Sequence, residues 1–380
     1  LRSVGGPGVT YIDRNGSGGT AVVWDNAPSS ALFEGFTVWG ASGSRGLSIR
    51  DSFLTVQNCV FNFHGVEGVK VFGGAPIFQH CELMINDVGL RVEEYSTAIF
   101  EDCLFAANTR AAEIANNDPE SEPTSPGDGC SFVRTDVVGN GPNGGTAGFV
   151  IDTSSPSFED CYFALNEGGN EGGAIYAYES SVPEFDSCTF AFNTANYGGA
   201  MYLRNSFSAI SGTTFIENDA SESGGAIRVT DSAPRFIDVL FSQNNARYGG
   251  GVYCTTGSQP EFGGFIPDDA VDFFSNTASD LGGAIYLEPK TSANLFTVSF
   301  NFNQADNGGA IYSEGSGALG YLLDFNYNLS NSGGGAITSE EDGSLITVEL
   351  SSFCSNLPVD VSGPIIQAPG SNVFDCSLFD

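Results

Sequence analysis

The sequence has few basic residues. Lys and Arg make up only 13 of its 380 residues, against 46 Asp and Glu, so the formal net charge is −33 at pH 7. Proteins that bind DNA or RNA need a basic surface, and so acidic a protein repels polyanionic ligands and anionic membrane surfaces. The composition therefore argues against a nucleic acid as a partner and is compatible with a soluble, extracellular protein.

Long hydrophobic runs are also absent. No stretch approaches the roughly 18 apolar residues of a membrane-spanning helix, and no apolar stripe follows the 3.6-residue period of a helix. Gly accounts for 50 residues, which disfavours long helices and suits tight turns. The sequence does not begin with Met and shows no signal peptide, so we expect a processed or excerpted segment without a membrane span.

Two short motifs recur in one register. The first is a Gly-Gly pair followed by a small residue and an aliphatic one, and the second is Phe-x-x-Asn. The first motif begins at Gly172, Gly198, Gly224, Gly249, Gly282, Gly308 and Gly334. The second begins at Phe105, Phe163, Phe190, Phe215, Phe241, Phe273, Phe300, Phe325 and Phe353. Such a repeat indicates a solenoid, which grows coil by coil instead of around one closed core.

The repeat predicts a parallel β-helix. Stretches such as Cys188-x-Phe190 alternate with the two-residue period of a strand, and Gly, Asn, Pro and Ser separate them. Propeller blades need about 40 residues, which is longer than this period. We therefore expect about 14–15 coils of 22–28 residues, each with two or three strands.

The repeat also predicts where the motif residues lie. Equivalent residues of successive coils should stack at the inter-strand spacing of about 4.8 Å. We expect the Phe rings to stack inside. The Asn amides should bond along a ladder at a turn, where the left-handed backbone conformation is tolerated, and each Gly-Gly pair should form a sharp corner.

We predict a single β-helix domain over residues 1–380. Residues 1–104 form less regular coils, and residues 105–380 carry the regular repeats. Two segments interrupt the period: an acidic loop at residues 109–130 and an insertion at residues 254–265. Insertions in solenoids tend to lie on one face and can carry binding.

The pairing of Gly-Gly-Ala-(Ile/Met)-Tyr with Phe-x-x-Asn resembles a known family. It is similar to the polymorphic outer-membrane-protein repeats of autotransporter-like passengers, and more broadly to the right-handed parallel β-helix group that includes pectate-lyase-like proteins. The resemblance is clear over about residues 100–356 and rests on register elsewhere. It implies an all-β, right-handed parallel β-helix with an extracellular, surface-displayed adhesive or structural role. It carries over no catalytic residue.

Two side-chain columns allow alternative interpretations. For the Cys column we favour stacked, inward-facing thiols over disulfides between coils or a metal site, since Cys-x-x-Cys spacing is absent. This column contains Cys59, Cys81, Cys103, Cys161, Cys188 and Cys376. For the Tyr column we favour a structural ladder over an outward platform for glycans. It contains Tyr176, Tyr202, Tyr253, Tyr286 and Tyr312.

Candidate site residues are few. Glycosidases need two carboxyl groups facing each other across a cleft, but acidic pairs such as Glu217 and Asp219 arise by chance among 46 acidic residues, so we assign no catalytic residue and no cofactor-binding residue. Asp268, Asp269 and Asp272, beside the second insertion, form a candidate Ca²⁺ site. Asn15 begins a glycosylation sequon, which applies only in a eukaryotic secretory protein.

The sequence thus predicts an extracellular or cell-surface β-helix module with a structural or adhesive role. A filament or cell-surface assembly subunit is one form that this role could take. The expected partners are other copies, joined end to end, or other surface proteins and glycans. The alternative is a carbohydrate-active enzyme or glycan-binding protein that acts on a neutral polysaccharide, in which case two converging carboxylates and an insertion should line a groove.

Overall fold

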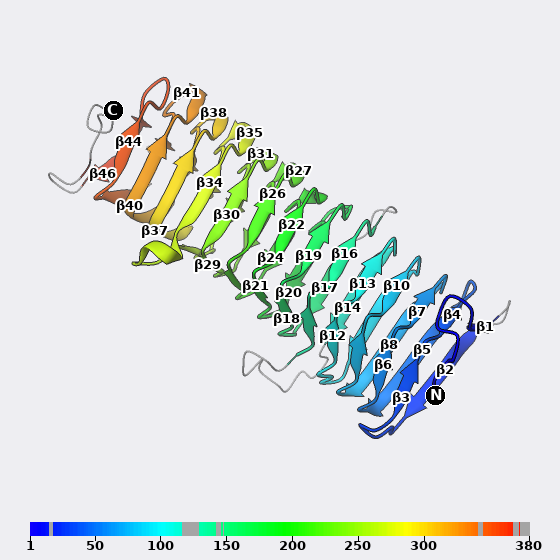
Figure 1. Cartoon of the computed structure of the whole chain (residues 1–380). Helices are drawn as coiled ribbons and strands as arrows, with labels where there is room; N and C mark the ends of the chain where they lie inside the picture. The colour runs from blue at the N-terminus through cyan, green and yellow to red at the C-terminus, as the bar shows by residue number, and fades with distance from the viewer. Residues whose placement is uncertain are drawn as a thin grey trace. The chain divides into compact units, whose positions relative to one another are not determined.

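The structure is a computed structural model (Figure 1). It describes residues 1–14, 18–115, 129–141, 146, 148–340, 345–367 and 372. The chain divides into two compact units, Leu1–Thr189 and Phe190–Asp380. The single domain over residues 1–380 stays a prediction, because the arrangement of the two units is not determined.

Unit 1 is built from short parallel strands on three faces. Each coil passes through face I, face II and face III in turn, and each strand pairs with its equivalent in the next coil. Face I contains β3 (Leu32–Glu34), β6 (Thr55–Gln57), β9 (Ile77–Gln79), β12 (Ile99–Glu101), β15 (Ser131–Val133), β18 (Ser157–Glu159) and β21 (Glu184–Asp186). Face II contains β1 (Tyr11–Asp13), β4 (Thr37–Trp39), β7 (Val60–Asn62), β10 (Glu82–Met84), β13 (Leu104–Ala106), β16 (Asp136–Val138) and β19 (Tyr162–Ala164). Face III contains β2 (Gly19–Asp25), β5 (Ser44–Ser52), β8 (Glu67–Gly74), β11 (Val88–Glu93), β14 (Arg110–Ala115), β17 (Phe149–Asp152) and β20 (Ile175–Tyr178).

Unit 2 repeats this plan and adds a fourth face between face II and face III. Strand β22 (Thr189–Ala191) spans the boundary between the units. Face I contains β25 (Ala209–Ser211), β29 (Arg235–Ile237), β33 (Glu261–Phe262), β43 (Leu345–Glu349) and β46 (Ile365–Gln367), and face II contains β26 (Thr214–Ile216), β30 (Val239–Ser242), β34 (Val271–Phe274) and β44 (Ser352–Cys354). The long strands β37 (Ser292–Asn301) and β40 (Gly317–Asn326) cross from face I to face II.

The remaining elements of unit 2 lie on faces III and IV and in the insertion. Face III contains β24 (Met201–Arg204), β28 (Ile227–Thr230), β32 (Val252–Cys254), β36 (Ile285–Leu287), β39 (Ile311–Ser313), β42 (Ile337–Ser339) and β45 (Val361–Ser362). Face IV contains β23 (Thr194–Tyr197), β27 (Asp219–Ser223), β31 (Asn245–Tyr248), β35 (Thr277–Leu281), β38 (Gln304–Asn307) and β41 (Leu329–Ser332). A short 3₁₀ helix, η1 (Pro267–Asp269), follows the insertion.

The predicted fold class is confirmed: the chain is an all-β, right-handed parallel β-solenoid with almost no helix. It makes about 13 turns, slightly fewer than the 14–15 expected. The fourth face of unit 2 was not expected, because its strands follow each Asn without the apolar alternation of a buried strand. Within the ranges given above, no helix is long and apolar enough to cross a membrane.

The Phe positions form the predicted inward columns. On face I of unit 1, the ring centroids of Phe78 and Phe100 lie 4.6 Å apart and those of Phe100 and Phe132 lie 4.8 Å apart. On face II of unit 2, Phe300 stacks on Phe325 at 4.8 Å. All of these rings are buried, so each coil contributes a flat aromatic layer to the core.

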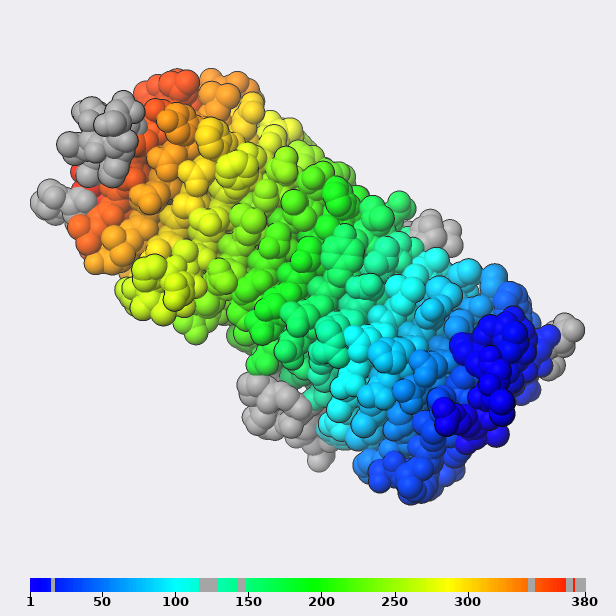
Figure 2. All heavy atoms as spheres, viewed as in Figure 1, coloured from blue at the N-terminus to red at the C-terminus, as the bar shows by residue number. Residues whose placement is uncertain are grey.

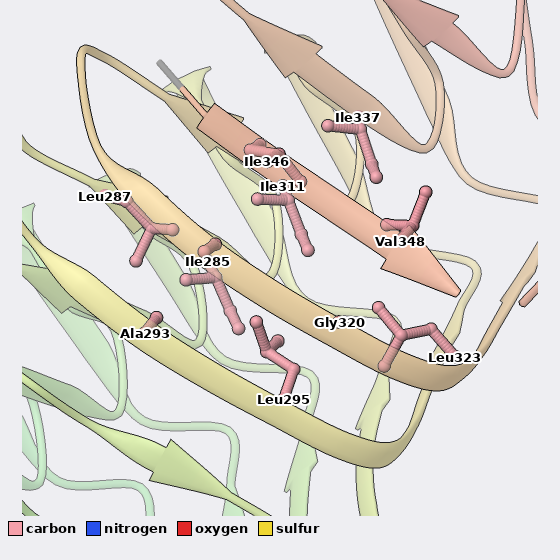
Figure 3. A pocket seen from close by; sticks show the side chains of 11 residues that line it. Ile285, Leu287, Ala293, Leu295, Ile311, Gly320, Leu323, Ile337, Ile346 and Val348 are labelled. Atoms are coloured by element: carbon pink, nitrogen blue, oxygen red, sulfur yellow. The ribbon is translucent and has the colours of Figure 1, made fainter. Parts of the chain in front are cut away.

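The face I column of unit 2 loses its aromatic rings in the later coils. Phe262 is followed in register by Leu295, Gly320 and Val348. These smaller side chains leave an apolar cavity of about 10 Å³ (Figure 3). A cavity of this size holds at most one water-sized sphere, and its apolar lining gives a water no hydrogen-bond partners. We therefore regard it as a local packing gap in the core.

The Asn positions form the predicted ladder. In unit 2, Asn244 donates from its backbone N and its Nδ2 to Oδ1 of Asn276 in the next coil, at 3.0 and 2.9 Å. Its Nδ2 also donates to the Phe215 carbonyl at 3.0 Å. Each buried amide therefore bonds to the coils on both sides of it. The left-handed residue, however, is the one before each Asn, such as Gln243 (φ 56°), and not the Asn itself.

The Gly-Gly pairs form the predicted corners, and their two members serve different purposes. Gly224 has φ 68°, a left-handed conformation that favours Gly. A Cβ on Gly225 would lie 2.1 Å from the carbonyl oxygen of Gly250 in the next coil. In the last pair, the left-handed residue is Gly333, one position before the predicted motif start at Gly334.

Candidate functional site

The three aspartates of the candidate Ca²⁺ site lie near the insertion but do not form a ligand group. Asp268 and Asp269 lie on η1, where Asp268 is exposed and Asp269 is partly buried. Asp272 lies on β34, where its Oδ1 accepts a hydrogen bond from Ser299. Among the residues that the structure describes, no group of three or more His, Cys, Asp or Glu side chains could hold a metal ion. The Ca²⁺ site therefore stays a prediction without a ligand set to support it.

The predicted glycosylation site cannot be placed. Asn15 lies outside the described residues. The second sequon begins at Asn328, which is 1% exposed and belongs to the Asn ladder, so an oligosaccharide could not be attached there in the folded chain.

The described cysteines of the main column are buried thiols, as favoured from the sequence, and Cys376 lies outside the described residues. Cys59, Cys81, Cys103, Cys130, Cys161, Cys188 and Cys254 are all free and buried. Burial raises the pKa of Cys59 to about 11 and that of Cys130 to about 12. These two thiols stay protonated at neutral pH, and a protonated thiol is a poor nucleophile. Cys354, outside the main column, is disulfide-bonded.

The Tyr column of unit 2 is mostly buried between faces III and IV. The rings of Tyr253 and Tyr286 are parallel, with centroids 4.8 Å apart, and Tyr312 continues the stack at 5.4 Å. Each hydroxyl donates to a carboxylate one coil further on: Tyr253 to Glu288 and Tyr286 to Glu314. Desolvation raises the pKa of both tyrosines, and the carboxylates raise it further. This column is therefore a structural ladder, not an open platform.

Arg228 replaces Tyr in one coil of this column. It is in register with Tyr202 on one side and Tyr253 on the other. Its guanidinium lies over the rings of Tyr197, Tyr202 and Tyr253, at 4.5, 5.6 and 5.0 Å. It also donates to the Ser223 hydroxyl, which occupies the place that Tyr197 and Tyr248 take in neighbouring coils. Arg228 thus fills a gap in the ladder through cation–π contacts.

The basic residues of unit 1 are largely neutralised on face III. Glu67, whose side chain is 4% exposed, pairs with Arg45 at 2.5 Å and with Arg91 at 3.1 Å. Lys70 pairs with Glu93 at 2.8 Å. These ion pairs leave no basic patch among them for a polyanionic ligand.

Unit 2 has a set of exposed aromatic side chains at the end of face II, which we call the aromatic corner. It consists of Phe274, Phe302 and Tyr327. Their exposed fractions are 43%, 51% and 57%. The rings of Phe302 and Tyr327 stack at 5.2 Å, and Phe274 meets Phe302 edge to face at 5.6 Å. Figure 1 shows the strands β34, β37 and β40, which carry or adjoin these residues, next to one another.

Two residues of the aromatic corner have a left-handed backbone. Phe302 has φ 59° and Tyr327 has φ 57°. For a bulky residue this conformation costs on the order of 1 kcal/mol or more. Other coils also place large residues, such as Phe63, Ile85 and Phe192, in this conformation directly before the ladder residue. The strain therefore belongs to the corner that each of these coils forms.

A row of hydrogen-bonding side chains lies beside the aromatic corner on the outer side of face II. We call it the polar strip. Asp272, Ser299 and Asp324 are in register on successive strands, as are Asn301 and Asn326. Ser352 donates to Asp324 at 2.5 Å, and Asn326 donates to Asn301 at 3.0 Å. The strip therefore repeats the same kinds of group from coil to coil.

The insertion borders the other end of this face. Phe265, at its end, is 73% exposed and lies 4.6 Å from the ring of Phe296. It also meets Tyr321 edge to face at 6.3 Å. We call these three residues the insertion cluster. The segment around η1 forms a projection on the surface of unit 2 (yellow-green in Figure 2).

Sequence reasoning missed the aromatic corner. Phe302 and Tyr327 occupy the position directly before the ladder Asn, which the motif leaves unspecified. A signal was present, since two successive repeats place an aromatic residue there, but its exposure follows from the left-handed corner. The acidic pair Glu217 and Asp219 is exposed to solvent. This agrees with its interpretation as part of the solvated surface and not as a catalytic pair.

Comparisons with known proteins agree with this architecture. Residues 125–265 match the family described as the right-handed beta helix region. Residues 270–288 match the Chlamydia polymorphic membrane protein repeat. No curated protein and no solved structure matches the chain. The resemblance seen in the sequence is thus confirmed: the chain is a right-handed parallel β-helix that carries a polymorphic-membrane-protein repeat.

Proposed function

We propose that the chain is a surface-displayed β-helix module that acts in adhesion or as a structural part of a cell-surface assembly. The observation that carries this proposal is the polymorphic-membrane-protein repeat at residues 270–288. This repeat suggests an outer-membrane or surface protein of the autotransporter-like kind. The matched segment contains Asp272 and Phe274, so it contributes to both the polar strip and the aromatic corner.

Surface display is tested by labelling intact cells of the source organism with antibodies raised against the purified chain. We expect labelling without permeabilisation, and its removal by an external protease. Labelling that requires permeabilisation would overturn the proposal. Adhesion is tested separately with beads coated with the chain, which should attach to cells more strongly than beads coated with albumin.

Self-association belongs to the same proposal, because a strand at the edge of a sheet can pair with a strand of another chain. Light scattering across protein concentration, with and without Ca²⁺, tests it. Particle mass that rises with concentration supports an assembly role, and dependence on Ca²⁺ would support the predicted site at Asp268, Asp269 and Asp272. A constant mass of one chain under all conditions would leave adhesion as the proposed role.

A further inference from the structure

We infer that the aromatic corner and the polar strip of unit 2 bind an uncharged polysaccharide. This inference rests on the proposed surface display and names the chemical class of the partner. It joins three observations: a group of exposed, stacked rings, a repeating row of hydrogen-bonding groups, and a local lack of basic side chains.

The aromatic corner offers an apolar surface that the fold itself leaves open. Phe302 and Tyr327 are about half exposed despite stacking on each other. The C–H groups of a sugar ring pack against aromatic rings, which present large contact areas with little conformational freedom to lose. Tyr327 adds a hydroxyl that can donate to or accept from a sugar hydroxyl.

The polar strip supplies the groups that sugar hydroxyls need. Asp272 and Asp324 accept hydrogen bonds, Asn301 and Asn326 both donate and accept, and Ser299 does both through one hydroxyl. Because these groups lie in register on successive strands, similar donors and acceptors recur at about the 4.8 Å spacing of parallel strands. A repeating array fits a polymer of repeating units better than a single small molecule.

Charge favours an uncharged partner. The protein has a net charge of −33, so it repels polyuronates and sulfated glycans. Neither the polar strip nor the aromatic corner contains Lys or Arg. The two carboxylates of the strip already accept hydrogen bonds from Ser299 and Ser352, which leaves this surface less suited to a strongly cationic protein than to a polyol.

The insertion cluster extends the same surface. Phe296 and Tyr321 precede the polar strip on β37 and β40, and Phe302 and Tyr327 follow it. Phe302 follows Phe296 by six residues, and the left-handed Thr297 (φ 53°) turns the chain between them. Phe296 and Tyr321 are partly exposed, and Phe265 beside them is 73% exposed. Accessible rings therefore lie on both sides of the strip, and a polysaccharide lying across it would contact both groups.

The test is affinity electrophoresis of the whole chain in native gels that contain hydroxyethylcellulose, galactomannan, dextran or soluble starch, with alginate as a polyanionic comparison. We expect at least one neutral polysaccharide to retard the chain and alginate not to. The double variant Phe302→Leu with Tyr327→Leu keeps apolar bulk but removes the rings. It should weaken binding at least about tenfold, as expected for central aromatic contacts.

The matched control is Phe192→Leu. Phe192 is also exposed, at 43%, and also has a left-handed backbone before a ladder Asn, but it lies outside the strip. It should bind like the native chain, and thermal unfolding should show all variants folded. Retardation by none of the neutral polysaccharides, by alginate alone, or equally in native and double variant would overturn the inference. Binding of polylysine that depends on the two rings would assign the surface to a cationic protein instead. Bead adhesion that persists without polysaccharide binding would leave the proposed function standing.

Discussion

At the scale of single residues, His64 shows how one side chain can substitute in a ladder built from another. It occupies the ladder position one coil before Asn86, and its backbone N donates to the Asn86 Oδ1 at 3.0 Å. Its ring contacts the Val38 carbonyl at 3.1 Å and the Ser44 hydroxyl at 3.2 Å. Gly40 and Gly46 make room for the ring, since a Cβ on either would overlap it.

This arrangement predicts a pH-dependent stability. Burial lowers the pKa of His64 below its usual value of 6.5, although the Val38 carbonyl partly opposes the shift. Because the unfolded chain binds the proton more readily, the contribution of His64 is fully present above pH 6.5 and decreases as the pH falls toward its folded pKa. Urea unfolding at pH 7.5 and at pH 5.5 measures how much the free energy of unfolding falls between the two pH values. We expect a larger decrease in the native chain than in His64→Asn, which restores the ladder residue. An equal loss in both would contradict the assignment of a buried, neutral imidazole.

A second residue-scale prediction concerns the ladder itself. Asn244→Ala removes the side chain that links the coils of Asn218 and Asn276. It leaves the buried Asn218 N–H and Phe215 carbonyl without these hydrogen bonds. We expect a loss of roughly 2–4 kcal/mol in the free energy of unfolding. Asn245→Ala, one residue later on the exposed surface, is the control and should change it by less than about 0.5 kcal/mol. Similar values for the two variants would show that the ladder contributes little.

At the scale of elements, the corners could be predicted and the outer surface could not. The motif positions predict the inward Phe rings, the buried Asn amides and the Gly corners. Each of these residues makes contacts within its coil or with the neighbouring coils, so the same residue type recurs at each position. The left-handed residue before Asn, the fourth face and the fused strands β37 and β40 were missed. Their sequences, such as Asp219–Ser223 on face IV, carry no apolar pattern from which a strand could be recognised.

The aromatic corner and the polar strip illustrate the same limit. Asp272, Ser299 and Asp324 lie far apart in the sequence, and only the register of three strands brings them together. By contrast, Asp268, Asp269 and Asp272 are close in sequence but lie on two elements. Equivalence between coils can therefore bring residues together on the surface that are far apart along the chain.

The Gly-Gly corners predict that two glycines of unit 2 differ in how well they tolerate substitution by Ala. Gly225→Ala places a methyl group against the carbonyl oxygen of Gly250. This oxygen belongs to the backbone of the next coil, which cannot move aside as a flexible side chain could. We expect it to destabilise the chain by about 1–3 kcal/mol or more in urea unfolding. Gly317→Ala is the control, because its Cβ would meet only the Thr291 carbonyl oxygen at 3.9 Å. Equal tolerance of both substitutions would show that the coils can separate at the corner.

At the scale of the whole molecule, the excess of acidic residues opposes folding through mutual repulsion. With a net charge of −33, added salt should stabilise the folded chain by screening this repulsion. We expect the melting temperature to rise by several degrees between about 20 mM and 300 mM NaCl, as measured by circular dichroism. Choline chloride should act as NaCl does. A rise with CaCl₂ alone at equal ionic strength would point to specific binding of the cation.

The ladder has a consequence for how such a chain can change in length. Asn218 and Asn244 make equivalent contacts to the coil before and the coil after. If residues 219–244 were deleted, Asn218 would meet Asn276 with the same donors and acceptors in place. Insertion or loss of one complete period is therefore a structurally neutral step, whereas a deletion of a few residues disrupts every column at once. Gene duplication and slippage can thus lengthen or shorten the protein in whole coils.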